Sequence, residues 1–496
     1  MLRKPTIFCS IQPGRKALVL TMGLSVLVSC LEAKVRQNNE PQVQVRYDSV
    51  WVAAPFEMPE IAVPVFPDQD FNIVSYGAKV KGSDTYEHCV EANTKAFGKA
   101  MEACHRAGGG RVVVPAGEWE TGPIHFESNV DLHLEQDAWL CFTDNPEAYL
   151  PAVETTWEGY LCYNYSPLIY AYQCENIAIT GEGGLAPKMD VWRTWFGRPQ
   201  PHLDALKQIY YWTSYNEPLA NRNIAVGESH LRPHLLQFNQ CKHIRLEDFK
   251  IRQAPFWTIH MFRCRQGVVR RLDVKAHGHN NDGIDLEMTR DFLVEDCTFD
   301  QGDDAVVIKS GSNQDAWRLN EPTENVVVRH CTIRKGHVLL GVGSELSGGV
   351  RNVYMHDCHA TGRVLNLFYL KTNRRRGGFI DHIYMERVSA GEMERAMAID
   401  TDVLYQWRNL VPTIKDSVTT ISHIYMRDVT CQKAKGIVQL NGDADAPIRY
   451  VRIDNLHVDS VSTFIQRNKN VEDFEISNLS YDWFGNTGES VYRFKE

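Results

Sequence analysis

The chain of 496 residues lacks any apolar run of the ~20 residues that a membrane-spanning helix needs. It also lacks a Cys-x-x-Cys pair, and with it the combined cysteine and histidine spacing of a structural zinc site. Positive charge is not in excess, because 53 Lys and Arg stand against 62 Asp and Glu, and the formal net charge of −9 disfavours nucleic acid as a partner. With 43% hydrophobic and 23% charged residues, the composition is that of a globular protein and excludes disorder, collagen and coiled coil.

The N-terminal segment has the proportions of a secretion signal. Basic residues, the last of them Arg15 and Lys16, precede an apolar stretch from Ala17 to Ser29. The stretch ends in Leu-Val-Ser before Cys30, which resembles a bacterial lipobox, so we expect cleavage after residue 29 and lipidation of Cys30. Acyl chains there would hold a bacterial lipoprotein on a membrane, at the periplasmic face or the cell surface. The alternative is an ordinary secretion signal with a chance cysteine.

The remaining chain divides at about residue 67. Residues 30–67 are polar and rich in proline, and we expect a tether with an extended lead-in. Residues 68–496 are expected to form one domain. Of the 13 cysteines, Cys9 and Cys30 belong to the predicted signal, which leaves an odd number. Because three of these occupy the same position of a repeat, we interpret them as buried small hydrophobic residues and not as a disulfide framework.

A pattern of apolar-x-apolar-x-x-apolar recurs in the second half of the chain. Its copies begin at Ile244, Phe292, Val326, Val353, Ile383, Ile424, Val451 and Phe474. Together with a weaker copy around Val269, their second positions follow one another at intervals with a minimum near 23 and only insertions above it, which indicates stacked coils. Alternation with period two indicates strands with one buried face. The sequence therefore predicts an all-β fold, a single right-handed parallel β-helix, with a β-sandwich as the alternative.

A solenoid needs a cap at its end, and one helix is predicted near the N-terminal end of this domain. The helix is expected over residues 93–106, with Asn93 as its N-cap and Gly108 as its stop. The residues that would share its buried face are Phe97, Ala100, Met101 and Cys104.

Four short polar segments each follow a repeat by a similar number of residues. They are 280–285, 302–304, 336–337 and 371–378. Because coils stack at about 4.8 Å, we expect Asp282, Asp303 and Asp304 to meet on one exposed side of the solenoid, whereas Asp285 alone is expected to be solvated. Repulsion between the three carboxylates should raise the pKa of one of them, leaving a protonated acid beside a carboxylate base. Glycoside hydrolysis requires that arrangement.

These segments resemble the motifs of glycoside hydrolase family 28, the polygalacturonases and their relatives. Asn280-Asn281-Asp282 resembles the family's Asn-Thr-Asp motif, and Gly302-Asp303-Asp304 matches its Gly/Gln-Asp-Asp motif. Gly336-His337-Val338 resembles its Gly-His-Gly motif without the second glycine, and Tyr369-Leu370-Lys371 resembles its Arg-Ile-Lys motif with Tyr in place of Arg. The resemblance extends from residues 71–79 to near the C-terminus.

The resemblance implies roles for these residues. Asp303 would be the general acid, supported by His337, while Asp282 and Asp304 would hold and deprotonate the attacking water. The expected substrate-binding positions are Asn280, Tyr369, Lys371, Arg374 and Arg376. Lys371 would hold a substrate carboxylate, and one of the arginines would replace the missing Arg, since Tyr cannot pair with a carboxylate. No metal or cofactor is expected, and the expected partner is a pectic polysaccharide or oligogalacturonide.

An aromatic-rich insertion over residues 184–232 bears on the mode of attack. It could wall one end of the cleft with rings for sugar stacking, or its rings could pack an extra subdomain. A blocked cleft favours attack from the chain end, so the leading hypothesis is an inverting, exo-acting hydrolase of α-galacturonosyl linkages in pectin. Endo-polygalacturonase and rhamnogalacturonan hydrolase are alternatives within the family. A calcium-dependent pectate lyase and a non-catalytic glycan-binding β-helix are alternatives of other classes.

Overall fold

The computed structural model describes residues 45–225, 229–403, 410 and 416–483. The predicted signal and the lipidation site Cys30 lie outside these residues. Within the described part of the chain, no helix combines the length and the apolar character needed to cross a membrane.

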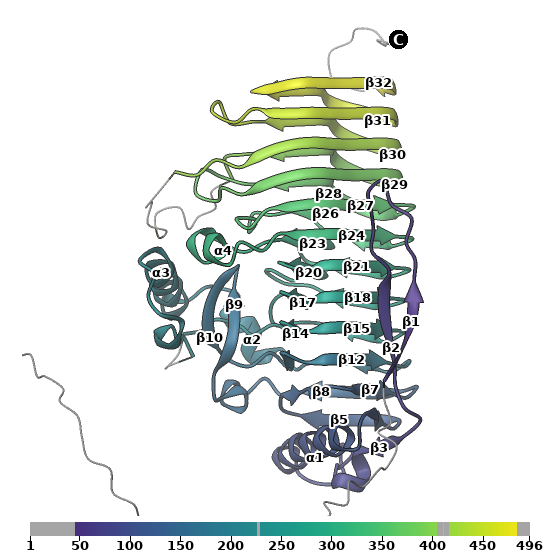
Figure 1. Ribbon diagram of the computed structural model, residues 1–496, viewed down its shortest axis with the longest axis vertical. Coiled ribbons are helices and arrows are strands. Elements are labelled where there is room, and N and C mark those ends of the chain that lie inside the picture. Colours follow the sequence, from purple (N-terminus) through teal and green to yellow (C-terminus); the bar gives the residue numbers. More distant parts are fainter. Residues whose placement is uncertain (1–44, 226–228, 404–409, 411–415, 484–496) are drawn as a thin grey trace, which may run out of the picture. The chain divides into compact units, whose positions relative to one another are not determined.

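The described strands, apart from two antiparallel hairpins, join into one sheet of 28 strands whose pairings are parallel. The sheet winds along the long axis of the molecule, from α1 (Tyr86–Arg106) at one end to β32 (Val471–Trp483) at the other (Figure 1). The predicted single parallel β-helix with an N-terminal helix is therefore confirmed.

Three stacks of strands form the coils. Stack A contains β3 (Asp70–Asn72), β4 (Gly110–Val114), β7 (Val130–Leu134), β12 (Glu175–Thr180), β15 (Lys242–Glu247), β18 (Arg265–Arg270), β21 (Arg290–Glu295), β24 (Thr323–Arg329) and β27 (Val350–His356). Stack B contains β5 (Gly117–Thr121), β8 (Ala138–Phe142), β13 (Gly184–Leu185), β16 (Lys250–Arg252), β19 (Asp273–Ala276), β22 (Thr298–Gln301) and β25 (Thr332–Lys335). Stack C contains β6 (Ile124–His125), β11 (Ile169–Tyr172), β14 (Leu236–Asn239), β17 (Ile259–Phe262), β20 (Ile284–Glu287), β23 (Val306–Lys309) and β26 (Val338–Val342).

Long strands continue the stacks toward the C-terminus. β28 (His359–Lys371) pairs with both β25 and β26, and so joins stacks B and C. The strands after it are β29 (Phe379–Asp400), β30 (Thr420–Asn441), β31 (Ile448–Lys469) and β32.

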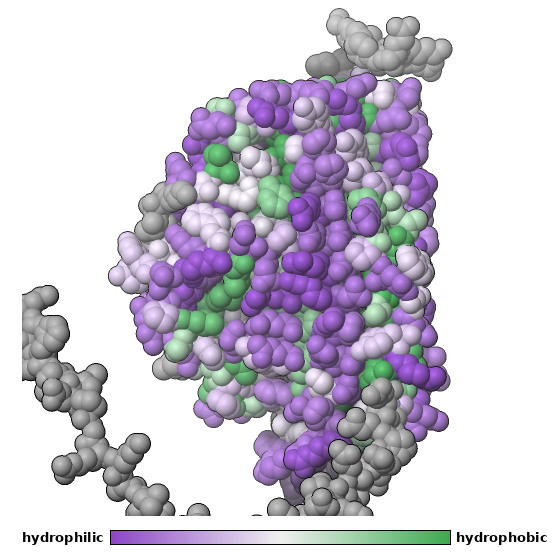
Figure 2. All heavy atoms as spheres, in the orientation of Figure 1, coloured by the Kyte–Doolittle hydropathy of each residue, from purple (hydrophilic) through white to green (hydrophobic). Residues whose placement is uncertain are grey.

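The register of stack A confirms the predicted repeat residue by residue. Leu246 pairs with Val269 and Val269 with Val294, and the same position continues through every later coil to Ile476. Period two decides which side chains enter the core, because Ile284 and Leu286 of β20 lie in it while Asp285 between them points outward. The surface seen in Figure 2 is accordingly mostly hydrophilic.

Each repeat of stack A from β15 onward carries two residues with left-handed backbone, five positions apart. In the first of these repeats they are His243, with φ 57°, and Asp248, with φ 74°. The same pair recurs at 266/271, 291/296, 325/330, 352/357, 382/387, 423/428, 450/455 and 473/478. Asn, Asp and His are the non-glycine residues that tolerate this conformation most readily, and they hold most of these positions. We refer to the two residues together as the bracket.

The capping helix α1 begins seven residues earlier than predicted. Its N-cap is Thr85, whose side chain accepts a hydrogen bond from the backbone of His88, so the prediction of Asn93 as N-cap is wrong. Asn93 is buried inside the helix, where its amide donates to the carbonyl oxygens of Lys79 (2.9 Å) and Glu120 (2.8 Å). A buried asparagine with backbone partners thus resembles a cap in the sequence. The predicted buried face of the helix is confirmed.

The described cysteines are all free, and all but Cys141 are buried. This confirms that they act as small core residues.

Two additions lie on different sides of the solenoid (Figure 1). β1 (Arg46–Val50) and β2 (Ile61–Val65) form an antiparallel hairpin whose Ile61 and Val63 pack against stack A, so part of the predicted tether and lead-in is folded onto the solenoid. The other side carries β9 (Val153–Trp157) and β10 (Tyr160–Asn164), also antiparallel, with α2 (Asp190–Trp195), α3 (Gln200–Ser214) and α4 (Asn313–Leu319). Three short 3-10 helices are η1 (Ile73–Tyr76), η2 (Pro146–Tyr149) and η3 (Leu219–Asn221).

Candidate active site

The three aspartates lie in the short turns that lead from stack B into stack C. Asp282 precedes β20, and Asp303 and Asp304 precede β23. The amide of Gly283 donates to the carbonyl of Asp304 at 2.9 Å, so Asp282 and Asp304 hold equivalent positions of neighbouring coils. Gly302 permits this turn to pass close to the coil before it, because a Cβ at this position would lie 2.5 Å from a backbone atom of Gly278. The expectation that the three carboxylates meet on one side of the solenoid is met.

A pocket of about 340 Å³ opens over these turns and over the outer face of stack C. The residues predicted from the sequence that line it are Asn280, Asp282, Asp303, Asp304, His337, Tyr369 and Lys371. Other side chains that line it include Glu158, Arg198, Trp257, Lys309 and Glu345.

Each of the three aspartates has its own cationic partner. The ammonium of Lys309 lies 3.4 Å from Oδ2 of Asp282, and the ammonium of Lys371 lies 2.5 Å from Oδ2 of Asp304. Nδ1 of His337 lies 3.2 Å from Oδ1 of Asp303. Three carboxylates can therefore share a small pocket without leaving an uncompensated negative field, which would repel an anionic sugar.

The pKa of Asp303 moves opposite to the expectation. Burial favours the neutral acid, but the hydrogen bond with His337 and the positive charges of His337 and Lys371 outweigh it, so the pKa of Asp303 lies below its ordinary value. The same hydrogen bond raises the pKa of His337. Repulsion between the carboxylates alone does not decide the pKa of Asp303, because the imidazole of His337 one coil away lowers it.

Asp282 is the aspartate whose pKa is raised. Burial is the main cause, the negative charge of Asp285 adds to it, and Lys309 opposes it, yet the pKa of Asp282 remains well above its ordinary value. Burial and Asp285, which the sequence left outside the cluster, thus contribute more to this shift than repulsion from Asp303 and Asp304 does. Its ionised form depends on Lys309 more than on any other cation around it.

Lys309 was not predicted from the sequence. Its ammonium contacts Asp285 at 3.1 Å and Glu345 at 3.2 Å in addition to Asp282, and it lies 3.6 Å from the centre of the Trp257 ring. These carboxylates outweigh the cost of burial, so the pKa of Lys309 lies well above its ordinary value. The signal was present in the repeat alignment, because Lys309 pairs in register with Glu287 of the preceding coil at an outward position.

Asp285 was expected to be solvated, but it is fully buried. Burial raises its pKa to about 7, against the opposing charge of Lys309. The pKa of Glu345 is instead lowered, to about 2, because the charges of Lys309 and Arg376 overcome the effect of burial. The floor of the pocket is thus a buried charge network centred on Lys309.

Lys371 reaches Asp304 from two coils away. It ends β28, and the intervening strand β26 carries Gly341, where a Cβ would lie 3.3 Å from Oδ2 of Asp304. The missing side chain leaves the carboxylate accessible from that direction. An ammonium group has three donors, so Lys371 can bond Asp304 and still offer donors to a ligand in the pocket.

The two predicted arginines do not line the pocket. Arg374 pairs with Asp443 at 2.7 Å and with Asp445. Arg376 is buried and donates to Oδ1 of Asn313 at 3.0 Å, and it lies 3.6 Å from Glu345. Their expected substitution for the missing Arg of the family motif is therefore not met. The guanidinium group that does line the pocket belongs to Arg198, between α2 and α3.

The rings of the insertion do not line the pocket and do not form a core of their own. Trp192 and Trp195 are buried in the core of the solenoid, and Tyr210 packs in a second cluster that includes residues of β9 and β10. Tyr211 and Tyr215 are exposed, and none of the aromatic residues between 184 and 232 lines the pocket. The insertion contributes Arg198 instead.

The tip of the β9–β10 hairpin adds Glu158 to the wall of the pocket. Its backbone is fixed, because Ser312 donates its hydroxyl to the carbonyl of Glu158 at 2.8 Å and its amide to the carbonyl of Gly159 at 3.0 Å. This hairpin was not predicted from the sequence, since its contact with the start of α4 spans about 150 residues.

Comparison with known proteins agrees with this geometry. The sequence profile described as glycosyl hydrolases family 28 matches residues 214–479, just over half of the chain. A "Probable polygalacturonase" of Vitis vinifera is 24% identical over 377 residues, which are 74% of this chain and 71% of that protein. An "Exo-poly-alpha-D-galacturonosidase" of Dickeya chrysanthemi is 27% identical over 313 residues, covering 57% of this chain and 48% of that one. An "Endo-polygalacturonase" of Pectobacterium carotovorum is also 27% identical, covering 48% and 56%.

Solved structures show the same similarity. An exopolygalacturonase from Thermotoga maritima superposes with a TM-score of 0.77 at 31% identity, and the match covers 85% of this chain and 93% of that one. A family 28 exopolygalacturonase of Yersinia enterocolitica superposes with a TM-score of 0.64 at 18% identity, covering 85% and 80%, and so supports the fold. The profile match and the shared fold establish that the chain belongs to glycosyl hydrolases family 28 and is a glycoside hydrolase of the polygalacturonase type.

Proposed function

We propose that this protein is an inverting, exo-acting hydrolase of α-galacturonosyl linkages in pectic polysaccharides. The observation that carries the proposal is the pocket itself, in which three aspartates with separate cationic partners face Glu158 and Arg198 on the walls. Paired carboxylates supply acid and base, and a wall limits how much of a chain can enter.

The proton for the leaving group comes from the pair of Asp303 and His337. In the free protein, the hydrogen bond between the two side chains lowers the pKa of Asp303 and raises the pKa of His337, which favours the proton on the imidazole. A bound sugar displaces water from the pocket, and an ion pair is less favourable than a neutral pair in such a medium. The proton then moves from Nδ1 of His337 to Asp303, which donates it to the glycosidic oxygen as the bond to the anomeric carbon breaks.

Asp282 and Asp304 hold the attacking water and take up its proton. An inverting enzyme needs roughly 6.5–9.5 Å between acid and base to admit the water. Lys309 opposes the protonation of Asp282, and the ammonium of Lys371 lies 2.5 Å from Asp304.

Attack from the chain end is supported by the walls of the pocket. The hairpin tip with Glu158 is fixed to Ser312, and Arg198 offers the planar guanidinium that suits a galacturonate carboxylate. An exo-enzyme and an endo-enzyme among the relatives are both 27% identical to this chain, so the proposal of attack from the chain end rests on the wall.

Product analysis on polygalacturonate and on rhamnogalacturonan backbone tests the proposal. We expect galacturonate monomer from the first minutes, with little fall in viscosity and with inverted configuration at the released anomeric carbon by NMR. Random oligomers with an early fall in viscosity would indicate an endo-enzyme. Release only from the rhamnogalacturonan backbone would move the protein to that substrate class.

We also propose that the mature chain is a lipoprotein anchored through Cys30. The basic N-terminal segment, the short apolar stretch and the lipobox-like residues before Cys30 support this proposal.

A further inference from the structure

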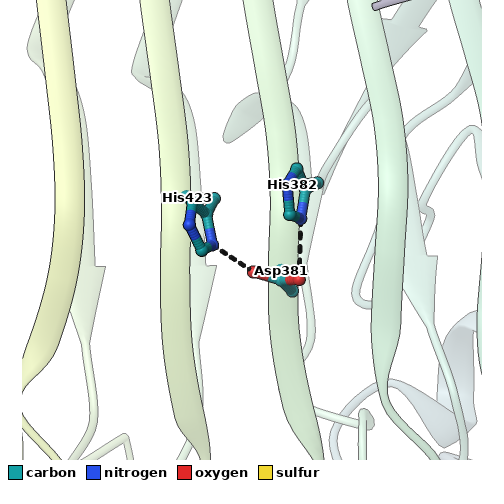
Figure 3. A group of neighbouring side chains, drawn as sticks. All are labelled: Asp381, His382 and His423. Atoms are coloured by element: carbon teal, nitrogen blue, oxygen red, sulfur yellow. Dashed lines mark hydrogen bonds and ion pairs between the residues drawn. The ribbon is translucent and has the colours of Figure 1, made fainter. Parts of the chain in front are cut away.

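A second cluster of ligand-type side chains lies on the outer face of β29 and β30. Asp381 and His382 belong to β29, and His423 belongs to β30 (Figure 3). The two oxygens of the Asp381 carboxylate bond the two imidazoles, since Nδ1 of His382 lies 2.7 Å from one and Nδ1 of His423 lies 2.8 Å from the other. The three ligand atoms all lie within 4.8 Å of one another.

The left-handed bracket positions bring the two imidazoles together. His382 and His423 are the first bracket residues of neighbouring coils, each with φ 55°, and their rings stack at 4.4 Å with 14° between the planes. In the preceding coils this position carries amides, and there Asn352 donates to Asn325 at 3.0 Å. Among the bracket positions of the described strands, only β29 and β30 place two imidazoles on adjacent coils beside a carboxylate.

The cationic neighbours of this cluster are each paired with a carboxylate of their own. The residues paired in register with Asp381 and Ser422 include Arg351 and Arg449, but Arg351 pairs with Glu324 at 2.6 Å and Arg449 with Glu472 at 2.9 Å. The hydroxyl of Ser422 donates to Asp381 at 2.7 Å and so fixes the carboxylate. The side chains of His382, His423 and Asp381 are 40%, 34% and 31% exposed, so solvent reaches the cluster.

We propose that Asp381, His382 and His423 form a binding site for a divalent transition-metal ion of the zinc type. Two imidazole nitrogens and one carboxylate oxygen are donors that suit Zn²⁺, Co²⁺, Ni²⁺ and Cu²⁺, whereas Ca²⁺ and Mg²⁺ require oxygen donors. The ion binds Nδ1 of each neutral imidazole, whose single proton is then on Nε2. Water completes the coordination on the exposed side.

The ion would link two coils, since Asp381 and His423 are 42 residues apart in the chain. A ligand that binds the folded state and not the unfolded chain stabilises the folded state. None of the three residues lines the catalytic pocket, so this site is separate from the reaction.

Titration of the full, untagged and metal-stripped chain with Zn²⁺, followed by calorimetry, tests this assignment, with Co²⁺ and its visible absorption as a second probe. We expect one ion per chain and a rise in the midpoint of thermal unfolding. His382→Asn and His423→Asn should each weaken binding about tenfold or more, on the scale of lost ligand support in metal sites. Asparagine tolerates the left-handed backbone and holds the same position in two earlier coils, so the fold should persist.

Two further variants serve as controls. His330→Asn changes a second bracket residue, with φ 54°, whose Nδ1 lies 3.7 Å from Asp296. The second bracket positions of the two neighbouring coils carry no imidazole. His337→Asn removes the imidazole of the other candidate ligand cluster, that of the pocket. Both should leave the stoichiometry and affinity unchanged. The assignment is overturned if the chain binds no Zn²⁺, or if binding persists in His382→Asn and His423→Asn and disappears in His337→Asn or His330→Asn.

Discussion

Replacing Lys309 by methionine should move the acid limb of the pH–rate profile to higher pH. Methionine keeps an unbranched side chain of similar length and removes the charge that opposes protonation of Asp282. If Asp282 must be ionised to hold and activate water, the enzyme becomes active only above the pKa of this group. Removing Lys309 raises that pKa, so kcat/KM should be lost at the lower end of the working range and return as pH rises.

The size of the shift follows from the geometry. A pair of unit charges 3.4 Å apart at an effective dielectric constant of about 20 interacts by about 5 kcal/mol, which corresponds to about 3.5 pKa units. Asp285 and Glu345 also face Lys309, at 3.1 and 3.2 Å, and will take up protons when it is removed. Because their neutralisation relieves part of the repulsion on Asp282, we expect a displacement of about 1–3 pH units.

The assay is the pH dependence of kcat/KM on oligogalacturonide for the wild type, Lys309→Met and Lys275→Met. Lys275 is an exposed lysine 3.5 Å from Asp300, and a surface pair of this kind should leave the profile in place. Breaking a buried pair costs about 3–5 kcal/mol, so thermal unfolding is followed in parallel. Recovery of activity at higher pH separates titration from loss of fold. An acid limb of Lys309→Met that superimposes on that of the wild type would refute the reasoning.

Three further outcomes are expected. Asp303→Asn should lower kcat by about 10²–10⁴-fold on pectic substrate and recover much of its rate on an activated aryl galacturonide, whereas an equal loss on both would reject Asp303 as the acid. Activity should persist in excess EDTA without formation of an unsaturated product, because carboxylates carry the proposed chemistry; loss on chelation with recovery on Ca²⁺ would indicate a lyase. Cys30→Ala should leave the membrane fraction with unchanged specific activity, and a wild type that is already soluble contradicts the anchor.

The coils and the three aspartates could be predicted because they repeat. The position of Leu246 recurs in every later coil of stack A, and its alignment also carries the offsets that bring Asp282 and Asp304 together. A feature that occurs only once in the chain, such as a helix cap, has no repeat from which it could be predicted. The N-cap of α1 was misplaced at Asn93 because a buried amide that bonds backbone groups has the same residue type as a cap.

The electrostatics of the site could be predicted only in part. Counting carboxylates showed that one pKa should rise, but which one depends on His337 and Lys309, whose distances no spacing rule supplies. The residues on the walls of the pocket were not predicted, for a different reason. Glu158 lies on a hairpin that meets Ser312 across more than 150 residues of sequence, and nothing local marks either side of this contact.

The brackets of stack A recur in every coil from β15 onward, although the length of chain between one bracket and the next varies. The extra residues of the longer coils fall in these intervals, as α4 does between β23 and β24. The intervals also contain the strands of stacks B and C, such as β16 and β17 between Asp248 and Gln266. For protein engineering, the loop between a strand of stack C and the next bracket is therefore the place where a segment can be exchanged between family members without re-aligning the strands on either side.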